Sequence, residues 1–228
     1  GHTVGVEATT GPLGQGMAMA VGMAMAEKHL AANFNTDEHK IIDHYTYTIV
    51  GDGCLMEGIT NEAASLAGTL GLSKLIVLYD SNNISIEGST DLAFQEDTRK
   101  RFEALGFNTL FVEDGNDIEA IEAAIIEAKK STDKPSFIEI KTKIGYASPQ
   151  EGSEKAHGSP LGAEGTKFLK ENLGWTEDEF TVPSEVDEYM DEVLAKLNSY
   201  EEDWNKLYAD YKEKNPELYA KLQKWLNN

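Results

Sequence analysis

A carboxylate and an amide each follow an apolar run of the chain, thirty residues apart. Asp52 lies in a Gly-Asp-Gly turn after residues 45–50, and Asn82 follows the run 75–79. In parallel sheets, ligands bind at the carboxyl ends of the strands. Carboxylate and carbonyl oxygens suit Mg²⁺ or Ca²⁺, and Gly53 lets the backbone approach a phosphate because it lacks a Cβ. A Gly-Asp-Gly sequence alone indicates only a turn, but the pair predicts a shared metal and phosphate site.

The two runs belong to an alternating series of helices and strands. The residue pattern predicts helices at 14–34, 57–70 and from 117, and strands at 45–50, 75–79, 109–112 and 136–141. Asn116 is expected to cap the helix that follows it, together with Glu119 three residues on. This alternation favours an α/β fold with a parallel sheet and helices on both faces.

Composition and charge limit the classes of partner. The chain has 228 residues, 40% of them hydrophobic, which is enough to bury a sizeable core. Forty acidic against 20 basic residues give a net charge of −20, so we expect neither nucleic acid nor a membrane as partner. The uncharged stretch 8–26 is too polar to span a membrane and is a candidate buried helix. The single cysteine, Cys54, cannot form an internal disulfide, which favours the cytoplasm.

The pattern changes after the last predicted strand. We expect an α/β domain at 1–180, its N-terminal part missing because the chain lacks an initial methionine, and a helical extension at 181–228 leading to a following domain. The loop 142–165, which contains His157, is long enough to suggest a function. Beyond Pro183, apolar residues spaced four and three apart predict long C-terminal helices, which pack on their own domain or form a coiled coil. These residues are Val186, Met190, Val193, Leu197, Tyr200, Trp204, Leu207 and Tyr211.

Four motifs, in order along the chain, resemble those of the transketolase family. They read GVEATTGPLGQG, DHYTYTIVGDGCLMEG, YDSNNISIEG and HGSPLG. Gly-Asp-Gly followed by the Asn-Asn pair is also similar to the broader signature of thiamine diphosphate enzymes. The resemblance covers most of the chain and implies a thiamine diphosphate-binding fold at 1–180.

The resemblance also assigns roles to particular residues. Asp52, Asn82 and the backbone carbonyl of Ile84 match the family's metal ligands, for Mg²⁺ with Ca²⁺ as the alternative. Gly53, Asn82 and His157 match positions that contact the diphosphate. His157 also matches a catalytic histidine close to the donor sugar, where an imidazole donates a hydrogen bond to a developing alkoxide. Without its His-Gly-Ser-Pro context, His157 would be an ordinary exposed loop residue.

Further matches concern the thiamine and the dimer. The loop whose backbone contacts the thiamine matches Gly11, Pro12 and Leu13. Glu57 and Glu62 match acidic residues of the family's dimer interface, although two exposed carboxylates on an ordinary helix would look the same. His2 follows a glycine but lies outside any Pro-Gly-His-Pro motif, so we assign it no catalytic role.

The resemblance implies an enzyme that acts on sugar phosphates. A transketolase uses thiamine diphosphate to transfer a two-carbon ketol unit from a ketose phosphate to an aldose phosphate in the pentose phosphate pathway, as a homodimer. The glutamate that activates the cofactor and the clamp for the substrate phosphate have no match here, so we expect the isolated chain to be inactive. Two alternatives stay open: another thiamine diphosphate enzyme, of the E1 dehydrogenase or deoxyxylulose-phosphate synthase type, and a non-catalytic interaction module.

Overall fold

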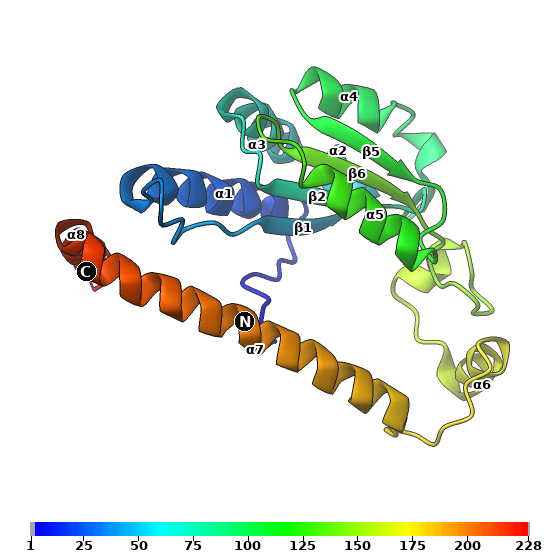
Figure 1. Ribbon diagram of the computed structural model, residues 1–228. Helices are drawn as coiled ribbons and strands as arrows, with labels where there is room; N and C mark the ends of the chain where they lie inside the picture. Colours follow the sequence, from blue (N-terminus) through cyan, green and yellow to red (C-terminus); the bar gives the residue numbers. More distant parts are fainter. Residues whose placement is uncertain (1–2, 228) are drawn as a thin grey trace. The chain divides into compact units, whose positions relative to one another are not determined.

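A computed structural model describes residues 3–227 (Figure 1), and His2 lies outside them. The elements are α1 (Gln15–Phe34), β1 (Thr46–Gly51), α2 (Asp52–Met56), α3 (Gly58–Leu70), β2 (Leu75–Ser81), β3 (Ile84–Ser85), β4 (Gly88–Ser89), η1 (Thr90–Leu92), α4 (Thr98–Ala104), β5 (Asn108–Val112), α5 (Ile118–Ala128), β6 (Ser136–Lys141), η2 (Glu154–His157), α6 (Gly162–Asn172), α7 (Ser184–Lys214) and α8 (Pro216–Leu226).

Four parallel strands form the main sheet, in the order β1-β2-β6-β5. β1 and β2 are neighbours, and Gly51 at the end of β1 lies opposite Asp80 in β2. The segments that follow the two strands therefore leave the sheet side by side. β3 and β4 form a separate, short antiparallel pair directly after β2.

Alternate side chains of the strands build one core on each face of the sheet. On one face, Leu75 and Val77 of β2 pack with side chains of α1, α3 and α4. On the other face, Ile76 and Ile138 pack with the apolar side of α5. Figure 1 shows α5 in front of the sheet, on the face opposite to α3 and α4. The predicted fold class, a parallel sheet with helices on both faces, is confirmed.

The chain divides into two compact units. The sheet unit comprises Gly1–Ala26 and His44–Leu173, and the helical unit comprises Glu27–Asp43 and Gly174–Asn228. The predicted extension at 181–228 lies within the helical unit, which also takes in the second half of α1 and the segment after it.

The helical unit has its own small core. Phe34 of α1 and Ile41 pack with Tyr211 of α7 and Leu222 of α8, so the C-terminal part of the predicted apolar seam is buried here. α7 ends just before Pro216, which begins α8 because proline lacks the N–H that a continued helix needs. No helix within residues 3–227 is long and apolar enough to cross a membrane.

One predicted helix cap is wrong. The residue that caps α5 is Asp117, whose carboxylate accepts a hydrogen bond of 2.9 Å from the N–H of Ala120. Asn116 instead donates to the carboxylate of Asp114, from its backbone N at 2.9 Å and from Nδ2 at 3.1 Å. These local hydrogen bonds hold Asn116 in the preceding turn, so the helix starts one residue later than predicted.

Candidate functional site

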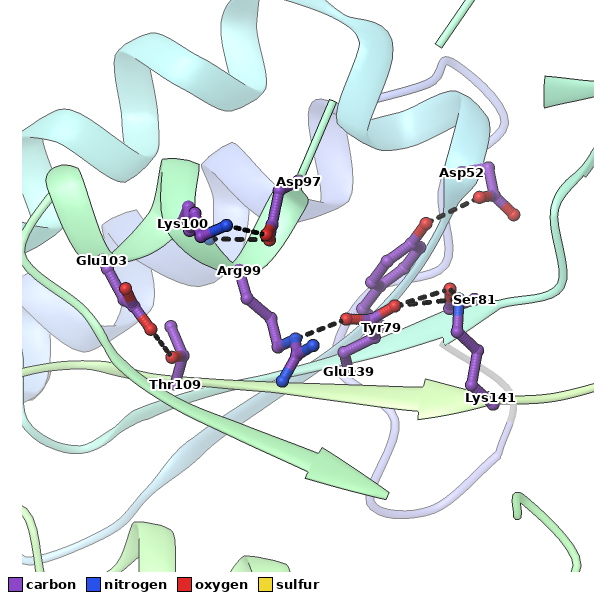
Figure 2. Close-up of polar contacts among 10 residues, drawn as sticks. All are labelled: Asp52, Tyr79, Ser81, Asp97, Arg99, Lys100, Glu103, Thr109, Glu139 and Lys141. Carbon is purple, nitrogen blue, oxygen red and sulfur yellow. Dashed lines mark hydrogen bonds and ion pairs between the residues drawn. The ribbon is translucent and has the colours of Figure 1, made fainter. Parts of the chain in front are cut away.

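The carboxylate of Asp52 is buried and only half satisfied. Asp52 begins the short helix α2 directly after β1, and it is 3% exposed. The hydroxyl of Tyr79 in β2 donates a 2.6 Å hydrogen bond to its Oδ1 (Figure 2). Its Oδ2 is also buried but accepts no hydrogen bond from the described residues. A buried carboxylate oxygen without a partner is costly, and a bound cation would offset that cost.

Burial dominates the electrostatics of this pair. It raises the pKa of Asp52, against the lowering effect of the Tyr79 hydrogen bond and of the nearby amides of Asn82 and Asn83. Neither amide makes a hydrogen bond of normal geometry to Oδ2. Burial, together with the hydrogen bond to Asp52, also raises the pKa of Tyr79 far above its ordinary value. Tyr79 therefore stays a hydrogen-bond donor, and a cation beside Asp52 would favour the charged carboxylate.

Asn82 shapes the loop that follows β2. Its Oδ1 accepts a hydrogen bond of 3.0 Å from the N–H of Ile84, and its Nδ2 donates to Oδ1 of Asp80 at 3.2 Å. Asn83 takes a left-handed conformation, with φ of +61°, which asparagine tolerates better than most residues. The side chain of Asn82 thus bends the backbone back on itself, and its amide oxygen has a second lone pair that a metal can use.

The predicted metal ligands are not a cluster of acidic or histidine side chains. Within residues 3–227, no three His, Cys, Asp or Glu side chains are placed to hold a metal ion together. The candidate set combines one carboxylate, that of Asp52, with the amide oxygen of Asn82 and the carbonyl of Ile84. All three oxygens belong to segments at the carboxyl ends of β1 and β2, and α2 packs beside β3, which begins at Ile84. Mg²⁺ prefers such small sets of oxygen ligands, with phosphate oxygens completing the octahedron.

His157 approaches the same region from the long loop. It ends the helical turn η2 and is exposed. η2 packs beside β3, so this turn lies next to the strand that begins at Ile84. The structure therefore brings the segment with His157 to the strands' carboxyl ends, although its imidazole makes no side-chain hydrogen bond to another described residue.

The loop predicted to contact thiamine lies against the Gly-Asp-Gly segment. A Cβ placed on Gly53 would lie 3.2 Å from Cδ1 of Leu13. Gly14, which ends the loop, has φ of +77°, and a Cβ there would lie 2.7 Å from Ile59 in α3. Glycine is required at Gly14 both for its conformation and for this close approach. The other two residues of the predicted loop, Gly11 and Pro12, are both exposed.

Glu57 and Glu62 are both exposed on the sheet unit. Glu57 lies between α2 and α3, where its backbone carbonyl accepts a hydrogen bond of 3.2 Å from the N–H of Thr60. Glu62 lies one turn into α3. Their predicted place in a dimer interface stays a prediction.

A second buried carboxylate lies on the strand beside Tyr79, and its charge is fully paired. Glu139 of β6 is opposite Tyr79 in the sheet. Its Oε1 accepts a hydrogen bond from Ser81 and forms an ion pair with Lys141, both at 3.0 Å (Figure 2). Its Oε2 forms an ion pair of 2.9 Å with Arg99. Both oxygens of Glu139 thus have partners within the protein, whereas Oδ2 of Asp52 has none among the described residues.

Arg101 of α4 fixes the other end of the helix that carries Asp52. Its Nη2 donates a 3.0 Å hydrogen bond to the carbonyl of Leu55, near the end of α2. Its Nη1 donates to the side chain of Asn61 in α3, and its Nε forms an ion pair of 2.6 Å with Glu96. Carbonyls at a helix end otherwise lack partners, so this guanidinium stabilises the position of α2.

Sequence reasoning missed Tyr79 and Arg101. A signal existed for Tyr79, because it is the only residue with a polar group in the apolar run 75–79 and lies on the strand next to the turn. No comparable signal existed for Arg101, since the oxygens of α2 and α3 to which it donates, on Leu55 and Asn61, lie far from it in sequence.

The family model described as "Transketolase, thiamine diphosphate binding domain" matches residues 1–228. The sheet and its strand-end loops are therefore those of a thiamine diphosphate-binding domain. Transketolases of Nostoc sp. and Bacillus subtilis are 55% and 54% identical over 99% and 98% of the chain. The chain belongs to the transketolase family. It spans about a third of the length of these curated relatives, 34% in both cases.

Solved structures agree with this assignment. A Pichia stipitis transketolase crystallised with sedoheptulose-7-phosphate is 47% identical and has a TM-score of 0.94, over 98% of this chain and 33% of that one. A transketolase from Leishmania mexicana is 46% identical with a TM-score of 0.92, over 96% of this chain and 33% of that one. The predicted family and the predicted fold are both confirmed.

Proposed function

We propose that this chain holds thiamine diphosphate through a divalent cation at the carboxyl ends of β1 and β2. The ligands are Oδ2 of Asp52, the amide oxygen of Asn82 and the carbonyl of Ile84. The observation that carries the proposal is the buried Oδ2 of Asp52, which no described residue satisfies. Mg²⁺ is the expected ion and Ca²⁺ the alternative, because both take oxygen ligands.

Neighbouring residues then have distinct tasks. Gly53 leaves room for a phosphate group beside the metal, because a side chain there would meet Leu13. Gly11, Pro12 and Leu13 form a wall for the thiamine rings. His157 contacts the diphosphate and donates a hydrogen bond to the oxygen of the reacting sugar, where negative charge develops.

The activity that we propose for the complete protein is ketol transfer between sugar phosphates. When bound, thiamine diphosphate supplies a carbon nucleophile and an electron sink for cleavage of the carbon–carbon bond. The residues of this chain position that group and hold the cation that would offset the charge of its diphosphate, and His157 donates a hydrogen bond to the reacting sugar. In support, relatives over 50% identical are named transketolase, and structural neighbours were crystallised with sugar phosphates. The reaction belongs to the pentose phosphate pathway.

We further propose that the complete protein is a cytoplasmic homodimer. Glu57 and Glu62 would lie in its interface, beside the partly exposed apolar side chains of Met56 and Ile59. The chain alone is expected to bind the metal and cofactor without turnover. The other thiamine diphosphate enzymes and the interaction module are less well supported, because the family match covers the whole chain.

Calorimetric titration tests the cofactor site directly. Thiamine diphosphate is titrated into the chain with and without Mg²⁺, and into the full-length protein that contains it. We expect binding that requires Mg²⁺ and that Asp52→Ala abolishes. Asp133→Ala is the matched control, because Asp133 is exposed in the loop before β6, at the opposite end of the strands. Binding that survives Asp52→Ala, or that needs no metal, would overturn the proposal.

A further inference from the structure

We propose that the hydroxyl of Tyr79 sets the metal preference of this site, by reserving one oxygen of Asp52 so that only the other faces the ion. Tyr79 is then a positioning residue, which acts on the metal through the carboxylate. The inference rests on the proposed function, because it concerns the same cation site.

The position of the Tyr79 hydroxyl is fixed by the sheet. β2 lies between β1 and β6, so both of its edges are paired. The ring is 3% exposed and packs 5.7 Å, between centroids, from the ring of Phe137 on β6. A buried ring on an inner strand cannot turn away without disrupting the core.

The carboxylate is held in one orientation as a result. Its Oδ1 accepts the 2.6 Å hydrogen bond from Tyr79, and its Oδ2 is the oxygen without a partner among the described residues. A hydrogen bond to an ionised acceptor is among the strongest in proteins. Oδ1 of Asp52 is therefore turned toward the buried hydroxyl of Tyr79, and Oδ2 is the oxygen that Asp52 presents to the ion (Figure 2).

The number of oxygens offered decides between the two ions. Mg²⁺ requires a compact octahedron, which a carboxylate enters through one oxygen. Ca²⁺ accepts six to eight oxygens and often binds both oxygens of one carboxylate. A carboxylate limited to one oxygen thus favours Mg²⁺ relative to Ca²⁺, and releasing the second oxygen removes that preference.

The test is Tyr79→Phe, which removes the hydroxyl and keeps the ring that packs on Phe137. The dissociation constants of Mg²⁺ and of Ca²⁺ are measured by calorimetry at saturating thiamine diphosphate, in the full-length protein that contains this chain. We expect the ratio of the Mg²⁺ constant to the Ca²⁺ constant to rise about tenfold, the factor associated with one charged hydrogen bond.

The matched control is Tyr211→Phe. Tyr211 is also buried, and its hydroxyl donates a 2.8 Å hydrogen bond to the carbonyl of Phe34 in the helical unit. This variant loses the same atom and is expected to be less stable with an unchanged ratio of the two constants.

The ratio of the Mg²⁺ and Ca²⁺ dissociation constants distinguishes a positioning role of Tyr79 from a general structural effect of the substitution. A general loss of order in Tyr79→Phe would weaken both ions alike, and an unchanged ratio would overturn the inference. If the unmodified protein binds thiamine diphosphate without any metal, the proposed function itself fails. Metal-dependent binding with an unchanged ratio refutes only the role of Tyr79.

Discussion

Gly68 permits a close backbone contact beside the site, and Gly68→Ala should destabilise the sheet unit. Gly68 lies inside α3, the helix that follows α2, which begins at Asp52. A Cβ added there would lie 1.8 Å from the carbonyl oxygen of Leu105 and 3.3 Å from Cα of Gly106. Both contacts are with backbone, so no side-chain rotation relieves the overlap.

The expected magnitude follows from two opposing contributions. Alanine is a better helix former than glycine by about 1 kcal/mol, which favours the variant. Overpacking costs about 1–3 kcal/mol where side chains can adjust, and an overlap with a rigid carbonyl lies at the top of that range or above it. The net loss is therefore about 2 kcal/mol or more, which corresponds to about 4–8 °C in Tm for a chain of this size.

Urea unfolding followed by far-UV circular dichroism measures this loss. The control is Gly22→Ala, also inside a helix, where an added Cβ meets nothing within 4 Å. Helix propensity alone predicts that both variants gain stability, whereas the structure predicts opposite signs. A Gly68→Ala protein as stable as the unmodified chain would refute the close approach of α3 to the turn after α4.

Two further substitutions test contacts on which the site and the helical unit depend. Arg101→Met removes the donor to the carbonyl of Leu55, so we expect about 2 kcal/mol less stability and weaker Mg²⁺-dependent cofactor binding. An unchanged affinity for the cofactor, measured by calorimetry, would contradict the role of Arg101 in holding α2. Hydrogen bonds with His39 and Lys214 lower the pKa of Asp210. The charged carboxylate of Asp210 therefore stabilises the fold fully above the ordinary carboxyl pKa, and this contribution disappears as the pH falls through the lowered pKa. Asp210→Asn should therefore reduce the urea midpoint at pH 7 and leave it unchanged in strong acid, as measured by tryptophan fluorescence, because all three tryptophans lie in the helical unit.

The sheet could be predicted from the sequence because its signals are local. The run 75–79 is apolar throughout, as expected for a strand covered on both faces, and it forms the centre of β2. The polar residues Asp52 and Asn82 follow such runs, and parallel pairing alone brings two strand ends together. The position of the candidate site at that edge thus needed no knowledge of long-range contacts.

Other features depend on contacts that the sequence does not display. The Gly-Asp-Gly segment continues into a short helix, α2, where a plain turn was expected. That helix has no side-chain cap at its start, and its last carbonyls are satisfied by Thr60 and Arg101 from later helices. A five-residue helix is too short to be stable by itself, so only tertiary contacts explain it.

Two buried carboxylates, Asp52 at the start of α2 and Glu139 on β6, show why the structure, rather than the sequence, distinguishes a candidate ligand site from a structural ion pair. Glu139 lies in an apolar strand and has every oxygen paired, by Ser81, Lys141 and Arg99. Asp52 has one oxygen held by Tyr79 and one buried without a partner among the described residues. A native protein rarely leaves such an oxygen unpaired unless something outside the chain completes it. The incomplete pairing of Asp52 is thus the observation that supports the proposed metal site, and Glu139 shows how the same fold neutralises a carboxylate by pairing within the chain.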